Sequence, residues 1–263
     1  MNIWWTLAGA ALRSGMQYRG NFLLALVSGV LYNAASFALI WILGARLNVV
    51  EGWRFEELSF LFGLRLAAHG LWIPFLGAVS NLEQLVRSGS FDSYLRRPAS
   101  PLVQVATSQV SIDSLAELGL GVAVLAWASG QTKIDWSAGS LLFLIAAVVG
   151  GALVESSIQI VLASLAFSEV NSRQLRTSLD QMITTVGGYP VSHFDAFGKI
   201  LFMSAVPIAF ISFVPGVVLL DKPNALPIPS WLGHLAPAVG AALFCAAIRF
   251  WNLQLRRYRS NGG

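Results

Sequence analysis

The chain has 263 residues, 56% of them hydrophobic, and a mean hydropathy of +0.66. Only 11% of its residues are charged, against about 25% in soluble domains, so too little charge is present to cover the surface of a soluble protein of this size. The composition therefore excludes a soluble globular protein and predicts a polytopic membrane protein.

The N-terminal residues 1–19 combine tryptophans with two arginines and lack the compact apolar core of a secretory signal. Their apolar residues recur at helical spacing, with the arginines on other faces. This pattern is typical of a helix that lies in the headgroup layer. We expect an interfacial helix over residues 1–19; the alternative is that these residues begin the first membrane span.

Several apolar runs are long enough to cross the hydrocarbon core, which is about 30 Å thick and takes about 20 helical residues. The third run is polar in its first half, and the fourth is the most uniformly apolar. The expected spans are residues 21–44, 57–79, 103–128, 139–167 and 231–255.

The region between the fourth and the last of these spans allows two layouts with the same number of crossings. In the first, residues 173–189 form a polar-faced fifth span, and residues 196–220 dip into the outer leaflet and return. In the second, residues 168–198 stay in the cytoplasm and residues 199–220 cross the membrane. Hydropathy alone favours the second layout, because residues 173–189 carry several charges.

The basic residues orient the chain, because cytoplasmic loops of membrane proteins are enriched in Lys and Arg. With six crossings and both termini inside, most of the arginines fall on the cytoplasmic side, within residues 13–19, 87–97, 173–176 and 249–259. We therefore expect both termini and the loop after the second span to be cytoplasmic.

That loop, residues 88–101, reads SGSFDSYLRRPASP and is unlike its apolar neighbours. Apolar residues at positions i, i+3 and i+4 predict one apolar face on a helix of barely two turns. An acidic residue at its start and two arginines at its end suit the helix dipole. A helix this short needs a surface to dock on, so we predict a cytoplasmic partner; the alternative is an interfacial loop whose arginines bind lipid phosphates. The candidate docking residues are Phe91, Asp92, Tyr94, Leu95, Arg96, Arg97 and Pro98.

Ionisable side chains also occur within the expected spans. There they must face protein or water, because a charge facing lipid at the centre of a span costs about 2.5–3.5 kcal/mol. Two interpretations stay open. Either the carboxylates neutralise Arg65 and Arg176 and hold the bundle together, or they line an acidic route that favours cationic amphiphiles. The candidate residues are Arg65, Asp113, Glu117, Glu155, Arg176 and Asp180.

The residues that commonly carry catalysis or bind metals form no recognisable set. The histidines, His69, His193 and His234, lie on different segments without a carboxylate-rich cluster at metal-ligand spacing, which favours structural or hydrogen-bonding roles. The phosphate-binding pattern G-x-x-x-x-G-K-[ST] is missing from the sequence. If the protein transports by ATP hydrolysis, the motor is a separate chain.

Two segments carry a resemblance to a known family. The stretch GSFDSYLRRPASP resembles the G-x-x-D-x-x-L-x-R-P segment that follows the second span in a family of bacterial ABC-2 type transporter permeases. A later stretch is similar to the same family's Y-P…I-P-x-A-F…P segment. The matching residues of that later stretch include Tyr189, Pro190, Pro207 and Pro215.

The resemblance implies an all-α ABC-2 fold with six transmembrane helices, an N-terminal interfacial helix, a cytoplasmic coupling helix and a re-entrant helical pair before the last span. It thereby favours the first layout. It also implies an exporter permease of the bacterial cytoplasmic (inner) membrane, which works as a dimer with an identical or a sister permease. Its further partners would be membrane lipid and a separate ABC ATP-binding subunit that holds ATP and Mg, with no nucleic acid, and no cofactor or metal in this chain.

Two other classes of function remain open from the residues alone. A proton-coupled secondary transporter would use intramembrane carboxylates such as Glu155 or Asp113, but the chain shows no evident inverted repeat, which many such folds carry. An intramembrane enzyme would need a catalytic set, and none is recognisable.

Overall fold

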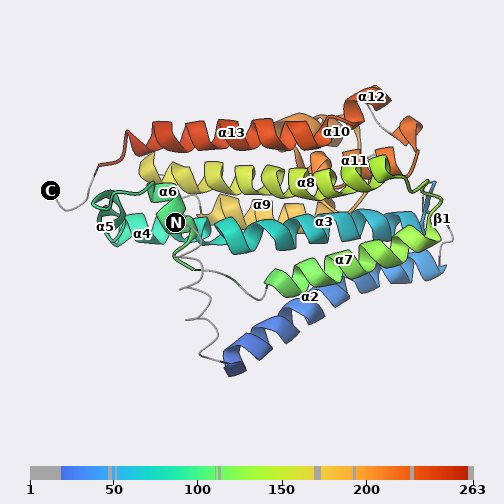
Figure 1. Cartoon of the computed structure of the whole chain (residues 1–263), viewed down its shortest axis with the longest axis horizontal. Helices are drawn as coiled ribbons and strands as arrows, with labels where there is room; N and C mark the ends of the chain where they lie inside the picture. The colour runs from blue at the N-terminus through green and yellow to red at the C-terminus, as the bar shows by residue number, and fades with distance from the viewer. Residues whose placement is uncertain are drawn as a thin grey trace.

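The computed structural model describes residues 19–46, 49–50, 52–109, 111, 114–168, 173–191, 194–225 and 228–259. Long helices lie side by side, and a short antiparallel hairpin of β1 (Val49–Val50) and β2 (Trp53–Arg54) stands at one end (Figure 1). The helices are α2 (Arg19–Arg46), α3 (Phe55–Leu76), α4 (Leu82–Arg87), α5 (Asp92–Leu95), α6 (Pro101–Ala106), α7 (Ser114–Gln131), α8 (Ala138–Ser164), α9 (Arg173–Val186), α10 (Ala196–Ile200), α11 (Phe213–Leu219), α12 (Ser230–Gly233) and α13 (Ala236–Leu255). The expected N-terminal helix, residues 1–19, lies outside the described residues except for its last residue.

The described helices make the chain an all-α polytopic membrane protein. Within the described ranges, 3 helical stretches are both long and apolar enough to cross a membrane: Phe55–Arg87, Ala138–Ser168 and Ala236–Leu255. The number rises to 4 if the bent pair Ala196–Ala205 and Ile208–Leu219 forms one span. Helices α2, α8 and α13 occupy residues of the predicted spans 21–44, 139–167 and 231–255, and α8 and α13 belong to the stretches that are long and apolar enough to cross a membrane.

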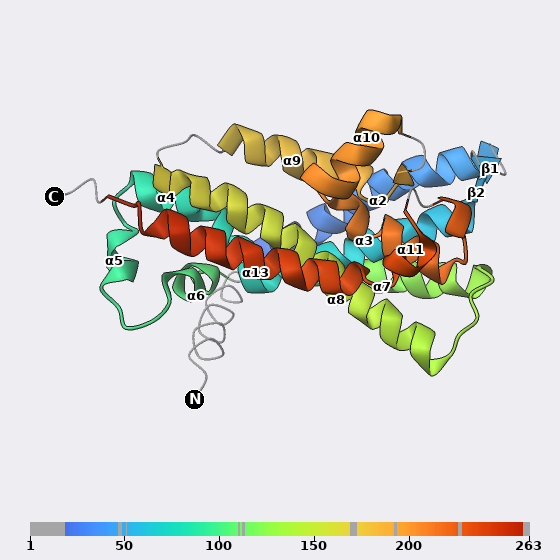
Figure 2. The same cartoon turned by 90° about the horizontal axis from the view of Figure 1, so that it is seen from above.

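Helix α3 is the centre of the bundle. It packs between α7 and α8, α13 packs on the far side of α8, and α2 contacts α3 and α7 (Figures 1 and 2). Glycines permit this close approach: a Cβ atom on Gly121 of α7 would lie 2.5 Å from the backbone nitrogen of Ala67, and one on Gly240 of α13 would lie 2.3 Å from the carbonyl oxygen of Gly150. Small residues at crossing points are the usual way in which membrane helices pack.

The structure corrects the prediction of one continuous third helix over residues 103–128. Helix α6 ends at Ala106 and α7 begins only at Ser114. Just after α6, the hydroxyl of Ser108 donates to the carbonyl of Val105, and the hydroxyl of Thr107 lies 3.3 Å from the carbonyl of Gln104. These side chains satisfy carbonyls that a continuing helix would bond, so the polar first half ends the helix.

The second helix is longer than the predicted span of residues 57–79. Helix α3 passes into a 3-10 segment, Gly77–Asn81, and then into α4, which ends at Arg87. Gly89 follows this helix, and its φ of 70° lies in the left-handed region of backbone angles that favours glycine. The helical stretch therefore ends at Arg87, after the end of the apolar run of residues 57–79, and the loop begins only there.

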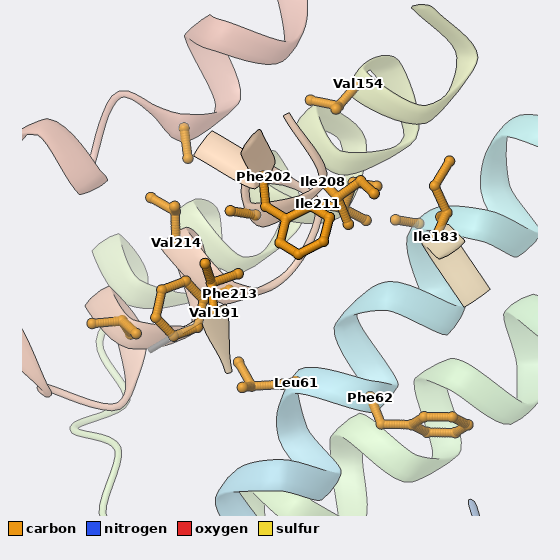
Figure 3. Close-up of a cluster of buried hydrophobic side chains, with 14 of the residues drawn as sticks. Leu61, Phe62, Val154, Ile183, Val191, Phe202, Ile208, Ile211, Phe213 and Val214 are labelled. Atoms are coloured by element: carbon orange, nitrogen blue, oxygen red, sulfur yellow. The ribbon is translucent and has the colours of Figure 1, made fainter. Parts of the chain in front are cut away.

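Residues 196–220 form a broken helical segment. Helix α10 passes into a π-helical turn, Leu201–Ala205, and after Pro207 the chain turns by 71° into a 3-10 turn and α11. Figure 3 shows side chains of this segment, among them Phe202 and Phe213, gathered with Leu61 of α3 and Val154 of α8. The bend is thus packed against protein, where irregular backbone is tolerated at membrane depth.

Candidate functional site

The loop between α4 and α6 lies at the end of the bundle opposite the hairpin (Figure 1). Its helix, α5, is a single turn, Asp92–Leu95, rather than the predicted two turns. Pro101 begins α6 at the first helical position after Ser100, where proline is favoured. A single turn has no stability of its own, so its position depends on contacts with the rest of the bundle.

Phe91 provides the main contact, and it does so inside the chain. Its side chain is fully buried, and its ring centroid lies 5.0 Å from that of Phe167 and 5.3 Å from that of Tyr258. Trp251 of α13 continues the cluster, 5.0 Å from Phe167. The prediction that Phe91 docks on a partner is therefore wrong: the apolar face of the loop faces its own bundle, because aromatic side chains of α13 and of the end of α8 complete a core there.

Two polar contacts fix the backbone of the loop. The buried amide of Gln104 on α6 donates to the carbonyls of Tyr94 and Ala99, at 2.9 and 2.8 Å. The hydroxyl of Tyr258 donates to the carboxylate of Asp92 at 2.9 Å. Burial, together with this hydrogen bond and the charge of Asp92, raises the pKa of Tyr258 to about 12, so the phenol stays protonated at neutral pH. These hydrogen bonds hold the loop rigidly in place at the end of the bundle.

The outward side of the loop carries the remaining candidate residues. Leu95 is 44% exposed, and Arg96, Arg97 and Pro98 are exposed beside it. Tyr94 is half-buried, and the guanidinium of Arg97 lies over its ring, 5.8 Å from the centroid. One apolar side chain flanked by two cations on a fixed base is suited to binding a protein surface with an apolar pocket and acidic groups.

A second group of functional residues lies inside the bundle, around His69 of α3. Its Nδ1 atom contacts Oε1 of Glu155 on α8, and its Nε2 atom lies 3.5 Å from Oε2 of Glu117 on α7. Asn33 of α2 donates to the other oxygen of Glu117 at 3.2 Å. His69 therefore contacts two carboxylates that lie far from it in the sequence. Within the described part of the chain, no group of three or more His, Cys, Asp or Glu side chains could hold a metal ion.

The two arginines of the predicted ion pairs have different surroundings. Arg65 is fully buried, its guanidinium lies 5.5 Å from the centroid of the Phe62 ring, and its Nε and Nη2 atoms have no hydrogen-bond partner. The glutamates expected to neutralise it contact His69 instead and remain within electrostatic range of it. The predicted partner Asp113 lies outside the described residues.

In the predicted ion pair on α9, Arg176 and Asp180 each bind a different partner. Arg176 donates to the carbonyl of Ser80, and Asp180 accepts from the amide of Gln159 on α8. The two charges are still close enough to interact electrostatically. Both residues therefore connect α9 to the helices beside it.

The tyrosine and the prolines singled out from the sequence lie around the broken segment. Tyr189 is half-buried and Pro190 is buried just after α9, and Pro215 is buried within α11. Pro207 stands at the bend itself. They shape the backbone and bring no reactive group, and His193 lies outside the described residues.

Three important residues were not among the predicted site residues: His69, Gln104 and Tyr258. A signal existed for His69, which lies one helical turn after Arg65 on the same helix and so shares its face. No comparable signal existed for Gln104 or Tyr258, because each acts on residues of the loop that only the folded chain brings close.

Comparison with protein-family models supports a membrane transporter. The model described as ABC-2 family transporter protein matches residues 30–262, which is most of the chain. Comparison with curated proteins gave no significant match, and comparison with solved structures gave none either.

Proposed function

The chain belongs to the ABC-2 family of transporter proteins, whose members are membrane subunits, and we propose that it is the permease subunit of an ATP-driven exporter. The observation that carries the proposal is the family match together with the rigid loop of residues 88–101, which presents Leu95, Arg96 and Arg97 outward. A separate ATP-binding subunit docks on this surface and holds ATP and Mg. Its conformational cycle then acts on α4 and α6, which border the loop.

In the proposed topology six helices cross the membrane: α2, α3 with α4, α7, α8, α9 and α13. The α10–α11 segment is re-entrant. The 71° bend at Pro207 supports a re-entrant segment. Helix α9 has 14 residues, about 21 Å of helix, so it needs flanking residues to cross the core. Six crossings place both termini and the loop in the cytoplasm of a bacterial cell, as the distribution of arginines favours.

The substrate pathway in this proposal forms between two permease chains, either identical or sister chains. The pairing is inferred from the family. It is compatible with the outward face of α2, where Leu24, Leu31 and Trp41 are exposed. Lipid covers the part of such apolar faces that the partner chain leaves free.

The docking surface is tested by introducing a charge at Leu95. We expect Leu95→Asp to reduce the amount of co-purifying ATPase subunit by at least about tenfold, because a loss of 1.4 kcal/mol already has that effect and an unpaired carboxylate in an apolar interface loses more. Transport should fall with it. The measurement is the ratio of ATPase to permease after affinity purification.

Trp136→Asp is the matched control. Trp136 is also 44% exposed, but it lies in the connection between α7 and α8 at the opposite end of the bundle. This variant should keep its ATPase subunit. Unchanged co-purification and ATPase stimulation in Leu95→Asp, with the variant correctly inserted, would show that the loop is not the docking surface.

A further inference from the structure

Both ring nitrogens of His69 face carboxylates. Nδ1 contacts Glu155 and Nε2 faces Glu117. A neutral imidazole has only one N–H, so its other nitrogen would direct a lone pair at a carboxylate oxygen. A further proton, whether on the imidazole or on one of the glutamates, converts this contact into a charge-assisted hydrogen bond. The geometry therefore favours a cluster that holds one more proton than a neutral histidine and two carboxylates would.

The charge of the cluster leads to the same conclusion. Arg65 lies one turn before His69 on α3 and is within electrostatic range of Glu117 and Glu155. One cation and two anions leave a net negative charge, and an unbalanced charge inside a helix bundle is unfavourable. One additional proton makes the cluster neutral.

Other titratable groups face the cluster from α2 and α9. Tyr32 of α2 is within electrostatic range of Arg65. Asp180 of α9 is within range of His69 and Glu155, but Arg176 lies one turn away on the same helix and opposes its charge. With Arg65 and the two glutamates charged, the cluster therefore still needs one additional proton to become neutral.

We propose that His69, Glu117 and Glu155 form a proton-binding site that fastens α3 to α7 and α8 while the proton is bound. When the proton is released, one ring nitrogen of His69 directs a lone pair at a carboxylate oxygen, and the cluster keeps a net negative charge. The contacts of α3 with α7 and α8 therefore weaken. Arg65 offers the released carboxylates another partner, because its buried Nε and Nη2 atoms have none. The site thus has two arrangements, as a conformational switch requires. The inference depends on the geometry of this chain and not on the proposed ATPase partner.

Thermal unfolding of the purified full-length protein in detergent micelles, from about pH 5 to about pH 8, covers the range in which histidine titrates. We expect the wild-type unfolding midpoint to fall by several degrees as the pH rises, because the stabilising proton is lost. His69→Gln should have a clearly smaller slope, because the imidazole can no longer hold the proton. His234→Gln is the control and should keep the wild-type slope, because His234 packs against Phe143 away from the cluster.

Glu117→Gln provides a second test in case His69→Gln does not fold. Its amide can still accept the hydrogen bond from Asn33, and Arg65 and Glu155 then balance each other without an extra proton. The pH slope should therefore disappear in this variant. A reduced slope in His69→Gln or a lost slope in Glu117→Gln supports the proton-binding site. A wild-type midpoint that does not change with pH, or a wild-type slope kept in every variant that folds, overturns it.

Discussion

Truncation of Phe91 to alanine is expected to lower the free energy of unfolding by about 3–5 kcal/mol, the usual cost of removing a fully buried aromatic side chain. Phe91 has no exposed surface and packs on Phe167 and Tyr258, so the truncation leaves a cavity at the base of the loop. The loss also frees α5, which is too short to hold its conformation alone. Denaturant or thermal unfolding of the purified protein in detergent measures the effect.

Leu95→Ala serves as the control for this truncation. Leu95 belongs to the same loop but is 44% exposed, so its truncation should change stability by about 0.5 kcal/mol or less. If both variants are equally stable, Phe91 does not anchor the loop, and the aromatic cluster is not the base of the docking surface.

Replacement of Gly121 by alanine is expected to separate α3 from α7. The added Cβ atom would lie 2.5 Å from the backbone nitrogen of Ala67, where only a movement of the helix can relieve the contact. Overpacking of this kind typically costs about 1–3 kcal/mol. The effect should appear as a lower unfolding midpoint and a lower yield of folded protein from the membrane.

Gly119→Ala, on the same helix, isolates the steric part of this effect. A Cβ atom at Gly119 meets nothing within 4 Å, so the substitution should be neutral or should stabilise the helix by up to about 1 kcal/mol. Because both variants gain the same helix propensity, the difference between them measures the clash. Equal stability of the two variants would contradict the close approach of α3 and α7.

The sequence predicts the long helices well where apolar residues run without interruption. Residues 139–167 correspond to α8, because backbone polar groups within a membrane must bond inside the segment and only a helix does this locally. The third span was predicted less well, since hydropathy averages over the polar residues near Thr107 and cannot show that their hydroxyls bond the last carbonyls of α6. Local side-chain hydrogen bonds decide such helix ends.

The candidate sites show a second limit of prediction from the sequence. Spacing predicts that Phe91 and Leu95 share a short helix, but it does not determine whether an apolar face packs inward on its own chain or outward on a partner. That choice depends on Trp251 and Tyr258, which lie far along the sequence. In the same way the partner of His69, Glu155, is 86 positions away, so its role emerges only when α3 and α8 are packed together.

Purification of the chain from its native membrane, with identification of the proteins that accompany it, tests most directly whether it is a permease driven by a separate ATPase. We expect a P-loop ATPase chain in the complex, and transport that stops when ATP is removed although the proton gradient is intact. A chain that is isolated without any ATPase, and that transports in response to a proton gradient alone, would contradict the proposed function and favour a secondary transporter.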